Sequence, residues 1–253
     1  MQRHMYRAAF AAFFAFALVP SAPSEDVMRA FTSNGVKPAM EELFEHSEHM
    51  AGIATVSEFN TTAALKQKIE SGAPFDFTLL TTEAIDDLIK KGKIDAGSRI
   101  EFARAGIGVG YRKGAPKPDI HDTEAVKKTL LAAKSVTFAE AGASRQYLEK
   151  MFVRLGIADQ MKAKTILEKG SGQPQMDVEQ GKAELVLTLV PEIPPYEGAA
   201  LAGPLPAELQ NYTSFAAGIS SSSQHKSEAK ALLEFITGPD GKPILKAKGL
   251  EPK

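Results

Sequence analysis

The chain has 253 residues, of which 43% are hydrophobic and 24% charged, and its 30 basic and 31 acidic residues give a formal charge of −1. A chain of this length and composition is expected to fold into one or two globular domains. It contains no cysteine, which excludes thiol catalysis and a disulfide scaffold. No basic stripe is present either, so we expect no nucleic-acid partner.

The start of the chain, residues 1–24, predicts a signal peptide. Two arginines precede an apolar run over 8–19, and a stretch of Pro, Ser and Ala follows it. This order is typical of an export signal, and the run is shorter than the ~20 residues that span a membrane. We therefore expect cleavage near Ala22 or Ser24 and a periplasmic mature protein. A buried helix or an uncleaved anchor is the alternative.

After this leader, short apolar runs alternate with helical patterns, which indicates βα units and an α/β fold with a parallel sheet. The expected strands span 26–32, 52–59, 76–80, 107–112, 135–138, 184–190 and 213–218. The expected helices span 61–71, 83–91, 123–133, 144–155, 173–181 and 227–237. Two segments rich in Pro and Gly, 113–119 and 191–206, are predicted to be surface loops.

Small polar residues follow three successive strands, at the points where helices begin. They are Ser33, Asn34 and Gly35 after the first strand, Asn60, Thr61 and Thr62 after the second, and Thr81 and Thr82 after the third. In α/β sheets ligands bind beyond the carboxyl ends of strands, and the unpaired amides of a helix start favour an anion. These residues therefore predict a site that holds a small anion with uncharged donors. Simple helix capping is the alternative.

The stretch ALKQKIESGAPFDFTLLTTEAIDDLIKKGKID resembles the Gly-Ala-Pro-x-Asp region of periplasmic molybdate-binding proteins and their relatives, the class II solute-binding components of ABC transporters. FTSNGVKPAMEEL, GASRQYLEKMFVRLGIAD and LLEFITGPDGKPILKAKGLEP fall in the order that this family would have. The resemblance covers nearly all of the mature chain.

The resemblance implies two lobes, each a mixed sheet flanked by helices, that clamp a ligand between them. Two crossover strands, near 101–114 and 212–220, would join the lobes. Hinge motion would then close the cleft on its ligand. The implied division is a signal peptide over 1–24, a first lobe over 25–106 plus 212–253, and a second lobe over 107–211.

Carried over by position, the resemblance places Ser33, Asn34 or Gly35, with Thr61 or Thr62, in the anion shell of the first lobe, and Thr81 on its wall. In the second lobe, Ser144 would offer a backbone amide, and Thr188 stands where molybdate binders have a tyrosine. Arg145 stands where relatives usually have glycine. Its guanidinium either contacts a ligand carboxylate in the cleft or points into solvent.

Weaker patterns have plain structural explanations. His46 and His49, three residues apart among glutamates, are expected on a solvated surface, because two imidazoles without a third marked ligand do not predict a metal site. Ser223 is expected to cap a helix, and Lys37 to lie in a solvated turn. No nucleophile elbow and no paired carboxylates mark a catalytic site.

Together with these patterns, the resemblance implies an exported, monomeric binding protein that presents a small anion to an ABC permease and has no cofactor and no enzymatic activity. A molybdate-like tetrahedral oxyanion ranks first as ligand and a small organic acid second. A shell of donors without acceptors would exclude protonated anions. A periplasmic enzyme that uses the same cleft would need a general base, which the sequence does not mark. A partner of a signalling receptor is the third possibility.

Overall fold

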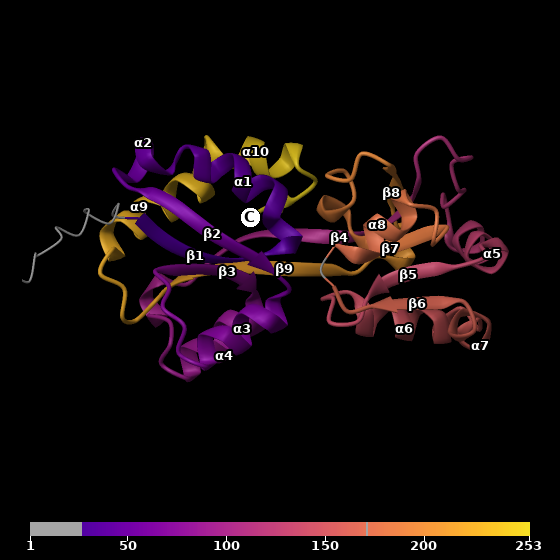
Figure 1. The fold of residues 1–253 in the computed structure, drawn as a ribbon, viewed down its shortest axis with the longest axis horizontal. Helices are drawn as coiled ribbons and strands as arrows, with labels where there is room; N and C mark the ends of the chain where they lie inside the picture. Colours follow the sequence, from indigo (N-terminus) through magenta and orange to yellow (C-terminus); the bar gives the residue numbers. More distant parts are fainter. Residues whose placement is uncertain (1–26, 171) are drawn as a thin grey trace, which may run out of the picture.

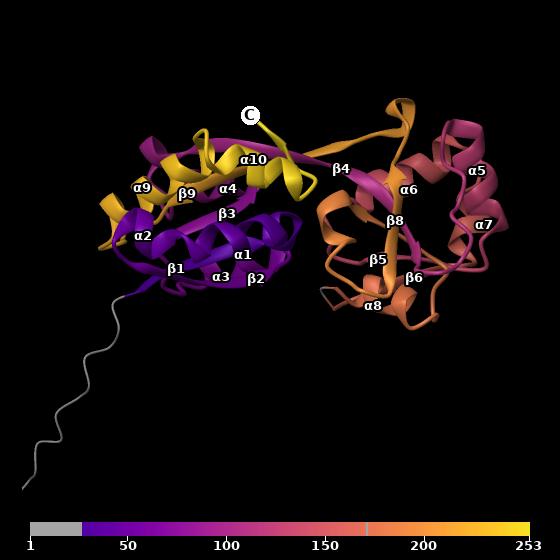
Figure 2. The same ribbon diagram turned by 90° about the horizontal axis from the view of Figure 1, so that it is seen from above.

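The computed structural model describes residues 27–170 and 172–253, so the predicted signal peptide lies outside the described residues. Two lobes lie side by side along the long axis of the molecule (Figure 1). Strands β4 (Ile100–Arg112) and β9 (Tyr212–Ile219) run between them, along one side of the molecule in Figure 2. Within the described ranges, no helix has the length and apolar character needed to cross a membrane.

The ten strands of the described residues form one mixed sheet in the order β2-β1-β3-β9-β4-β7-β5-β6, with β8 and β10 also paired to β4. The remaining strands are β1 (Val27–Ser33), β2 (Ala54–Asn60), β3 (Phe77–Thr81), β5 (Val136–Ala139), β6 (Thr165–Glu168), β7 (Leu185–Leu189), β8 (Ala199–Pro204) and β10 (Glu251–Pro252). Strand β1 pairs in parallel with β2 and β3, whereas β9 pairs antiparallel with β3 and β4. The mixed sheet that the family resemblance implied is therefore confirmed. The parallel sheet indicated by the βα alternation describes only part of it, because β9 belongs to the chain returning from the second lobe.

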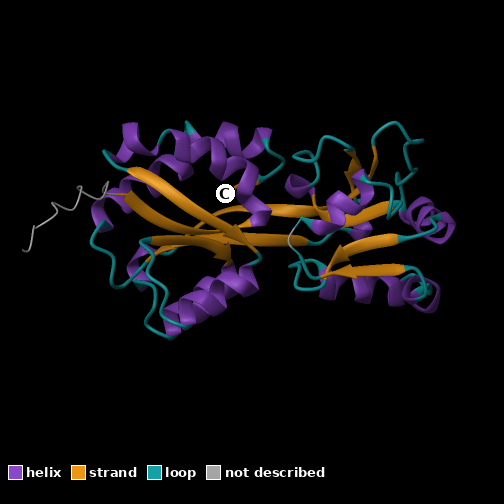
Figure 3. Ribbon diagram, viewed as in Figure 1, coloured by secondary structure: helices purple, strands orange, loops and turns teal. Residues whose placement is uncertain are grey.

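Helices cover both faces of the sheet in the first lobe (Figure 3). Helices α1 (Lys37–Glu45), α2 (Ser47–Ala51), α9 (Lys226–Thr237) and α10 (Gly241–Ala247) lie on one face, and α3 (Thr62–Glu70) and α4 (Thr82–Lys90) on the other. The second lobe contains α5 (Thr123–Ala132), α6 (Arg145–Arg154), α7 (Ala158–Lys162) and α8 (Gln173–Glu179). Short 3-10 helices are η1 (Asn34–Val36), η2 (Ala96–Ser98), η3 (Val190–Glu192) and η4 (Ala207–Leu209).

The central strands are apolar on both faces because helices cover both. Along β1, Met28 and Ala30 belong to the core cluster under α1 and α9, while Phe31 joins the cluster formed with α3 and α4. Alternation of side chains along a strand produces this division. All seven predicted strands and all six predicted helices correspond to observed elements, with ends shifted by one or two residues, except that β4 begins at Ile100 instead of the predicted residue 107.

Three short strands were not predicted. Strand β6 forms one edge of the sheet, β10 has two residues, and β8 lies inside 191–206, which we expected to be a loop. Strand β8 contains Gly203 and Pro204, residues that disfavour strands, and its pairing with β4 determines its conformation. Local pattern is weakest for such short strands, so tertiary pairing decides.

Strand β4 connects the two lobes. Up to Gly106 it pairs with β9, and from Ile107 it pairs with β7. The side chain of Gln210 lies beside this change of partner: its amide oxygen accepts from Ile107 N at 2.7 Å, and its nitrogen donates to Ile107 O at 3.0 Å. The expected first crossover thus corresponds to β4. The lobe limits at 106/107 and 211/212 remain a prediction.

Candidate functional site

A cleft of about 480 Å³ lies between the two lobes. Its walls are built from the points where strands give way to helices: the starts of η1 and α3 in the first lobe, and the starts of α6, α8 and η3 in the second. Chain segments far apart in sequence therefore bring polar groups to one hollow. This volume falls within the ~300–1,000 Å³ of typical small-molecule sites.

The first-lobe wall carries a cluster of hydroxyl groups. The Thr62 hydroxyl donates to Ser33 Oγ at 3.2 Å, which links the loops after β1 and β2. Ser33 Oγ also accepts from Gly35 N at 3.4 Å, and Thr61 Oγ1 accepts from Ala64 N at 3.3 Å as the cap of α3. Capping and cleft lining therefore coexist here. Ser33, Asn34, Thr61 and Thr62 all line the cleft, as predicted.

Lys37 is a cleft residue that the sequence interpretation missed. We expected it in a solvated turn, yet it lines the cleft at the start of α1. Its Nζ lies 5.5 Å from the centroid of the Phe59 ring, which also lines the cleft, and 3.5 Å from Glu41 Oε1. Of the cleft-lining side chains in the described ranges, Lys37 alone is cationic. It can attract an anion, although Glu41 partly neutralises it.

The second-lobe wall includes Ser144 and Thr188, both predicted site residues. Ser144 is the N-cap residue of α6 and is buried, but its hydroxyl makes no capping hydrogen bond. It therefore lies at a helix start and can donate to a ligand. Thr188, near the end of β7, is also buried and donates its hydroxyl to Glu192 Oε2. That hydroxyl is thus already engaged with a side chain that the prediction did not include.

Glu192 is the main residue of the cleft that sequence reasoning missed. It ends η3, directly beyond β7, and lines the cleft. Burial raises the pKa of its carboxyl, while hydrogen bonds from the Thr188 hydroxyl and the Leu189 amide act in the opposite direction. A signal was present in the sequence: Glu192 is the first acidic residue after the buried strand LVLTL, and ligands collect beyond such strand ends.

Two further side chains surround Glu192. The Gln175 amide, 5% exposed, donates from Nε2 to Glu192 O at 3.2 Å, while its Oε1 is buried without a partner among the described residues. Because Glu192 O is a carbonyl and only accepts, this bond fixes the orientation of the amide. Tyr196 also lines the cleft, and burial, followed by the charges of Glu192 and Glu179, raises its pKa.

Four predicted site residues do not line the cleft. Gly35 is buried against Phe215, and Asn60 accepts the Thr61 amide through Oδ1 at 2.8 Å. Thr81 pairs with Phe215 in the sheet. Arg145 donates from Nε to Glu149 at 2.9 Å and from Nη1 to Glu140 O at 2.9 Å. These partners hold its guanidinium along the surface of α6, so the outward interpretation of Arg145 describes this structure.

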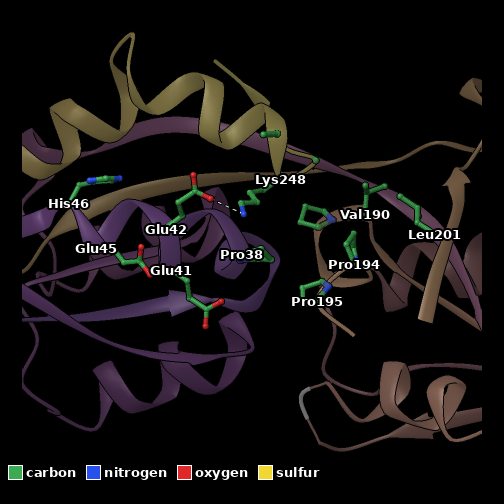
Figure 4. Close-up of a pocket in the computed structure, with 13 residues that line it drawn as sticks. Pro38, Glu41, Glu42, Glu45, His46, Val190, Pro194, Pro195, Leu201 and Lys248 are labelled. Carbon is green, nitrogen blue, oxygen red and sulfur yellow. Dashed lines mark ion pairs between the residues drawn. The ribbon is translucent and has the colours of Figure 1, made fainter. Parts of the chain in front are cut away.

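A larger hollow, of about 840 Å³, adjoins the cleft and shares Pro38, Glu41 and Pro195 with it. Figure 4 shows glutamates of α1 on one side and prolines of the 190–195 segment on the other. Its cation, Lys248, is paired with Glu42 at 2.7 Å. Because this hollow brings the carboxylates Glu41, Glu42 and Glu45 together with apolar residues, the smaller cleft remains the candidate site for an anion.

The other sequence motifs do not form a second site. The His46 ring packs edge-on against the Phe235 ring, with the two ring centroids 6.1 Å apart. The described residues contain no group of three or more His, Asp or Glu side chains arranged for a metal ion. Ser223 donates to Asp76 Oδ1 at 2.6 Å and accepts from His225 N, which is a structural role.

Taken together, the cleft can receive an anion at one wall and exchange a proton at the other. Hydroxyls and Lys37 supply donors on the first-lobe side. Glu192 supplies the acceptor, or the acid, on the second-lobe side. The expectation of a shell without acceptors is therefore wrong, because the cleft contains a carboxylate, Glu192, that the sequence interpretation did not mark.

Comparison with known proteins identifies a family and similar proteins for this chain. The sequence profile described as "Bacterial extracellular solute-binding protein" matches residues 28–251. An aconitate isomerase from Pseudomonas sp is 28% identical over 231 residues, which cover 89% of this chain and 87% of that protein. The molybdate-binding protein ModA of Azotobacter vinelandii is 25% identical over 238 residues, which cover 92% of each.

Solved structures share the fold. The structure of the Azotobacter vinelandii periplasmic molybdate-binding protein superposes with a TM-score of 0.74 at 20% identity, over 88% of this chain and 98% of that one. At this identity the likeness shows the two-lobed architecture of periplasmic binding proteins and does not extend to the ligand.

Proposed function

Because the chain belongs to the family of bacterial extracellular solute-binding proteins, we propose that it is exported and captures a small organic acid between its two lobes. An ABC permease is the partner that receives the acid. The protein acts as a monomer in this proposal. Hinge closure about β4 and β9 would bury the bound acid and strengthen its hydrogen bonds.

The observation that carries this proposal is the pairing of unlike walls in one cleft. Ser33, Thr62 and Lys37 suit an ionised carboxylate. Glu192 on the opposite wall repels a second full negative charge but accepts or shares a proton. A carboxylic acid with more than one polar group fits both walls, because its ends can differ in protonation.

A molybdate-like oxyanion remains the second ligand of the proposal. The hydroxyl groups of the first-lobe wall and the similarity to a molybdate-binding protein support it. A fully ionised tetrahedral dianion, however, would face Glu192 with no proton to offer. We therefore place the organic acid first, in reverse of the order that the sequence motifs suggested.

A thermal-shift panel tests the ligand class. It contains succinate, malate, citrate, aconitate, molybdate, sulfate and phosphate. A ligand present at 100 times its dissociation constant stabilises the fold by about 2.7 kcal/mol. We expect at least one di- or tricarboxylate to raise the melting temperature more than any oxyanion. A shift with molybdate alone would contradict the organic-acid assignment, and no shift with any compound would contradict the binding function.

Isomerisation of an unsaturated acid is a second candidate function, and Glu192 is the observation that favours it. The carboxylate could remove a proton from a carbon next to a ligand carboxyl and return it to another carbon, which shifts the double bond without loss of atoms. An aconitate isomerase is among the similar proteins. Incubation of the pure protein with trans-aconitate, followed by proton NMR, tests this. Formation of the cis isomer that Glu192→Gln abolishes would establish the enzyme, whereas binding without turnover would leave the transport function.

A further inference from the structure

The half-buried carboxyl of Glu192 lies in a cleft whose opposite wall attracts anions. Its Oε2 accepts the Thr188 hydroxyl, and the Gln175 amide holds the backbone carbonyl of Glu192 at 3.2 Å. These contacts fix where the carboxyl lies. No cation in the described part of the chain lies within ion-pair distance of the Glu192 carboxyl. Lys37, the cation of the cleft, pairs with Glu41 instead.

The charged and titratable groups near Glu192 come from several elements. Lys37 and Glu41 of α1 line the same cleft, and Tyr196 follows Glu192 in its own segment. The carboxylate of Glu179, in α8, accepts a hydrogen bond from Gly198 N at 2.8 Å. Lys248, which follows the last residue of α10, pairs with Glu42 in the adjoining hollow. None of these groups neutralises Glu192. A second anion brought beside it therefore meets an uncompensated carboxylate.

When two carboxylates share one site, one of them keeps a proton. We propose that Glu192 holds a proton in common with an acid group of the bound ligand, so that the cleft takes up about one proton with each anion. This inference rests on the proposed function and specifies it. Glu192 is then the specificity-determining residue of the cleft. It favours weak acids, whose acid groups can share a proton, over anions of strong acids such as sulfate.

Thr188 has a defined part in this arrangement. Its hydroxyl donates to the Glu192 carboxyl and so favours the ionised form. Removal of that hydroxyl should make Glu192 hold its proton to a higher pH. The direction of this change separates an acid–base role of Thr188 from a purely structural one. A packing defect would not shift the pH dependence of ligand binding in a fixed direction.

Isothermal titration calorimetry of the chain with succinate and citrate, between pH 5.5 and 8.5 and in buffers of different ionisation enthalpy, tests the proposal. We expect net proton uptake that approaches one per ligand, and affinity that falls up to about tenfold per pH unit once Glu192 must be reprotonated. In Glu192→Gln the part of this dependence that exceeds the ligand's own titration should disappear. In Thr188→Val the midpoint should move to higher pH.

Glu197→Gln is the matched control, because Glu197 is an exposed glutamate five residues further along the same segment and does not line the cleft. It should keep the wild-type pH profile. Equal pH slopes in the wild type and Glu192→Gln would overturn this inference and leave the proposed function standing. If Glu192→Gln fails to fold, an unmoved midpoint in Thr188→Val overturns it. If no carboxylate of the thermal-shift panel binds the wild type, the proposed organic-acid function fails, and this inference with it.

Discussion

The two walls of the cleft are built from the same kind of junction, a strand that ends where a helix begins, yet they differ in the balance of hydrogen-bond donors and acceptors. The first-lobe wall offers Ser33, Thr62 and Lys37, all able to donate, and its one carboxylate among the described residues, Glu41, is paired with Lys37. The second-lobe wall adds Glu192 and the buried amide oxygen of Gln175, which accept. The comparison teaches that the backbone amides of helix starts supply donors by default, whereas the acceptors of this cleft are side chains, as Glu192 and Gln175 are.

Loss of a donor from the first-lobe wall should have the largest effect. Thr62→Val removes the hydroxyl that contacts Ser33 in the cleft. We expect about a 10- to 100-fold loss of ligand affinity, because hydrogen bonds to charged groups contribute about 1.5–3 kcal/mol. Calorimetric titration with the best ligand of the panel measures this.

Thr82→Val is the matched control for that change. Thr82 is the first residue of α4 and also follows a threonine N-cap, but it does not line the cleft. The Thr82→Val variant should bind the ligand with the affinity of the wild type. Equal losses in the two variants would show that the first-lobe wall does not bind the ligand through this hydroxyl.

The contact between the two walls is sensitive to volume at Gly35. A Cβ added there would lie 2.5 Å from Phe215 Cζ and 2.8 Å from Leu189 Cδ1. We therefore expect Gly35→Ala to lower the free energy of unfolding by about 1–3 kcal/mol, as overpacked cores do. Urea denaturation measures it, with Gly97→Ala as control, since its Cβ would lie 3.5 Å from the nearest atom. Unchanged stability in Gly35→Ala would mean that the packing between η1 and Leu189 is looser than described.

The acceptor wall should give the unliganded protein a distinct pH dependence. Burial raises the Glu192 pKa above its ordinary value of 4.5, so the folded state binds the proton more tightly than the unfolded state. This contribution is complete below pH 4.5 and is lost as pH rises through the folded-state pKa. Denaturation of wild type and Glu192→Gln across this window should therefore show a difference that changes with pH. A constant difference would contradict the raised pKa.

Arg145 should have the smallest effect, although the sequence made it a candidate carboxylate ligand. Its guanidinium is held by Glu149 and by the carbonyl of Glu140, outside the cleft. We expect Arg145→Gly to change the affinity for every ligand of the panel by less than about threefold, as for other surface substitutions. A collapse of carboxylate binding alone would show that Arg145 turns into the cleft when ligand binds.

The cleft residues that the sequence predicted differ from those it missed in how locally their position is determined. Ser33, Thr61 and Thr62 follow strands with clear hydrophobic pattern, and rules for strand ends and helix starts apply to them locally. Lys37 and Glu192 are ordinary charged residues by local criteria, in segments that resemble surface turns. Only the approach of α1 and η3 to each other places them on the walls of one cleft.

The sequence by itself determined the order of most strands and helices, the α/β class and the hydroxyl-rich helix starts, because each depends on periodicity and on neighbours within a few residues. The two-lobed arrangement was implied by the resemblance to a known family and not by these local patterns. The tertiary structure alone decided that β9 enters the sheet antiparallel and that β8 and β6 are strands. It also decided that Arg145 stays outside while Glu192 lies in the cleft. Those outcomes depend on contacts between segments distant in the chain, whose energies no local pattern records.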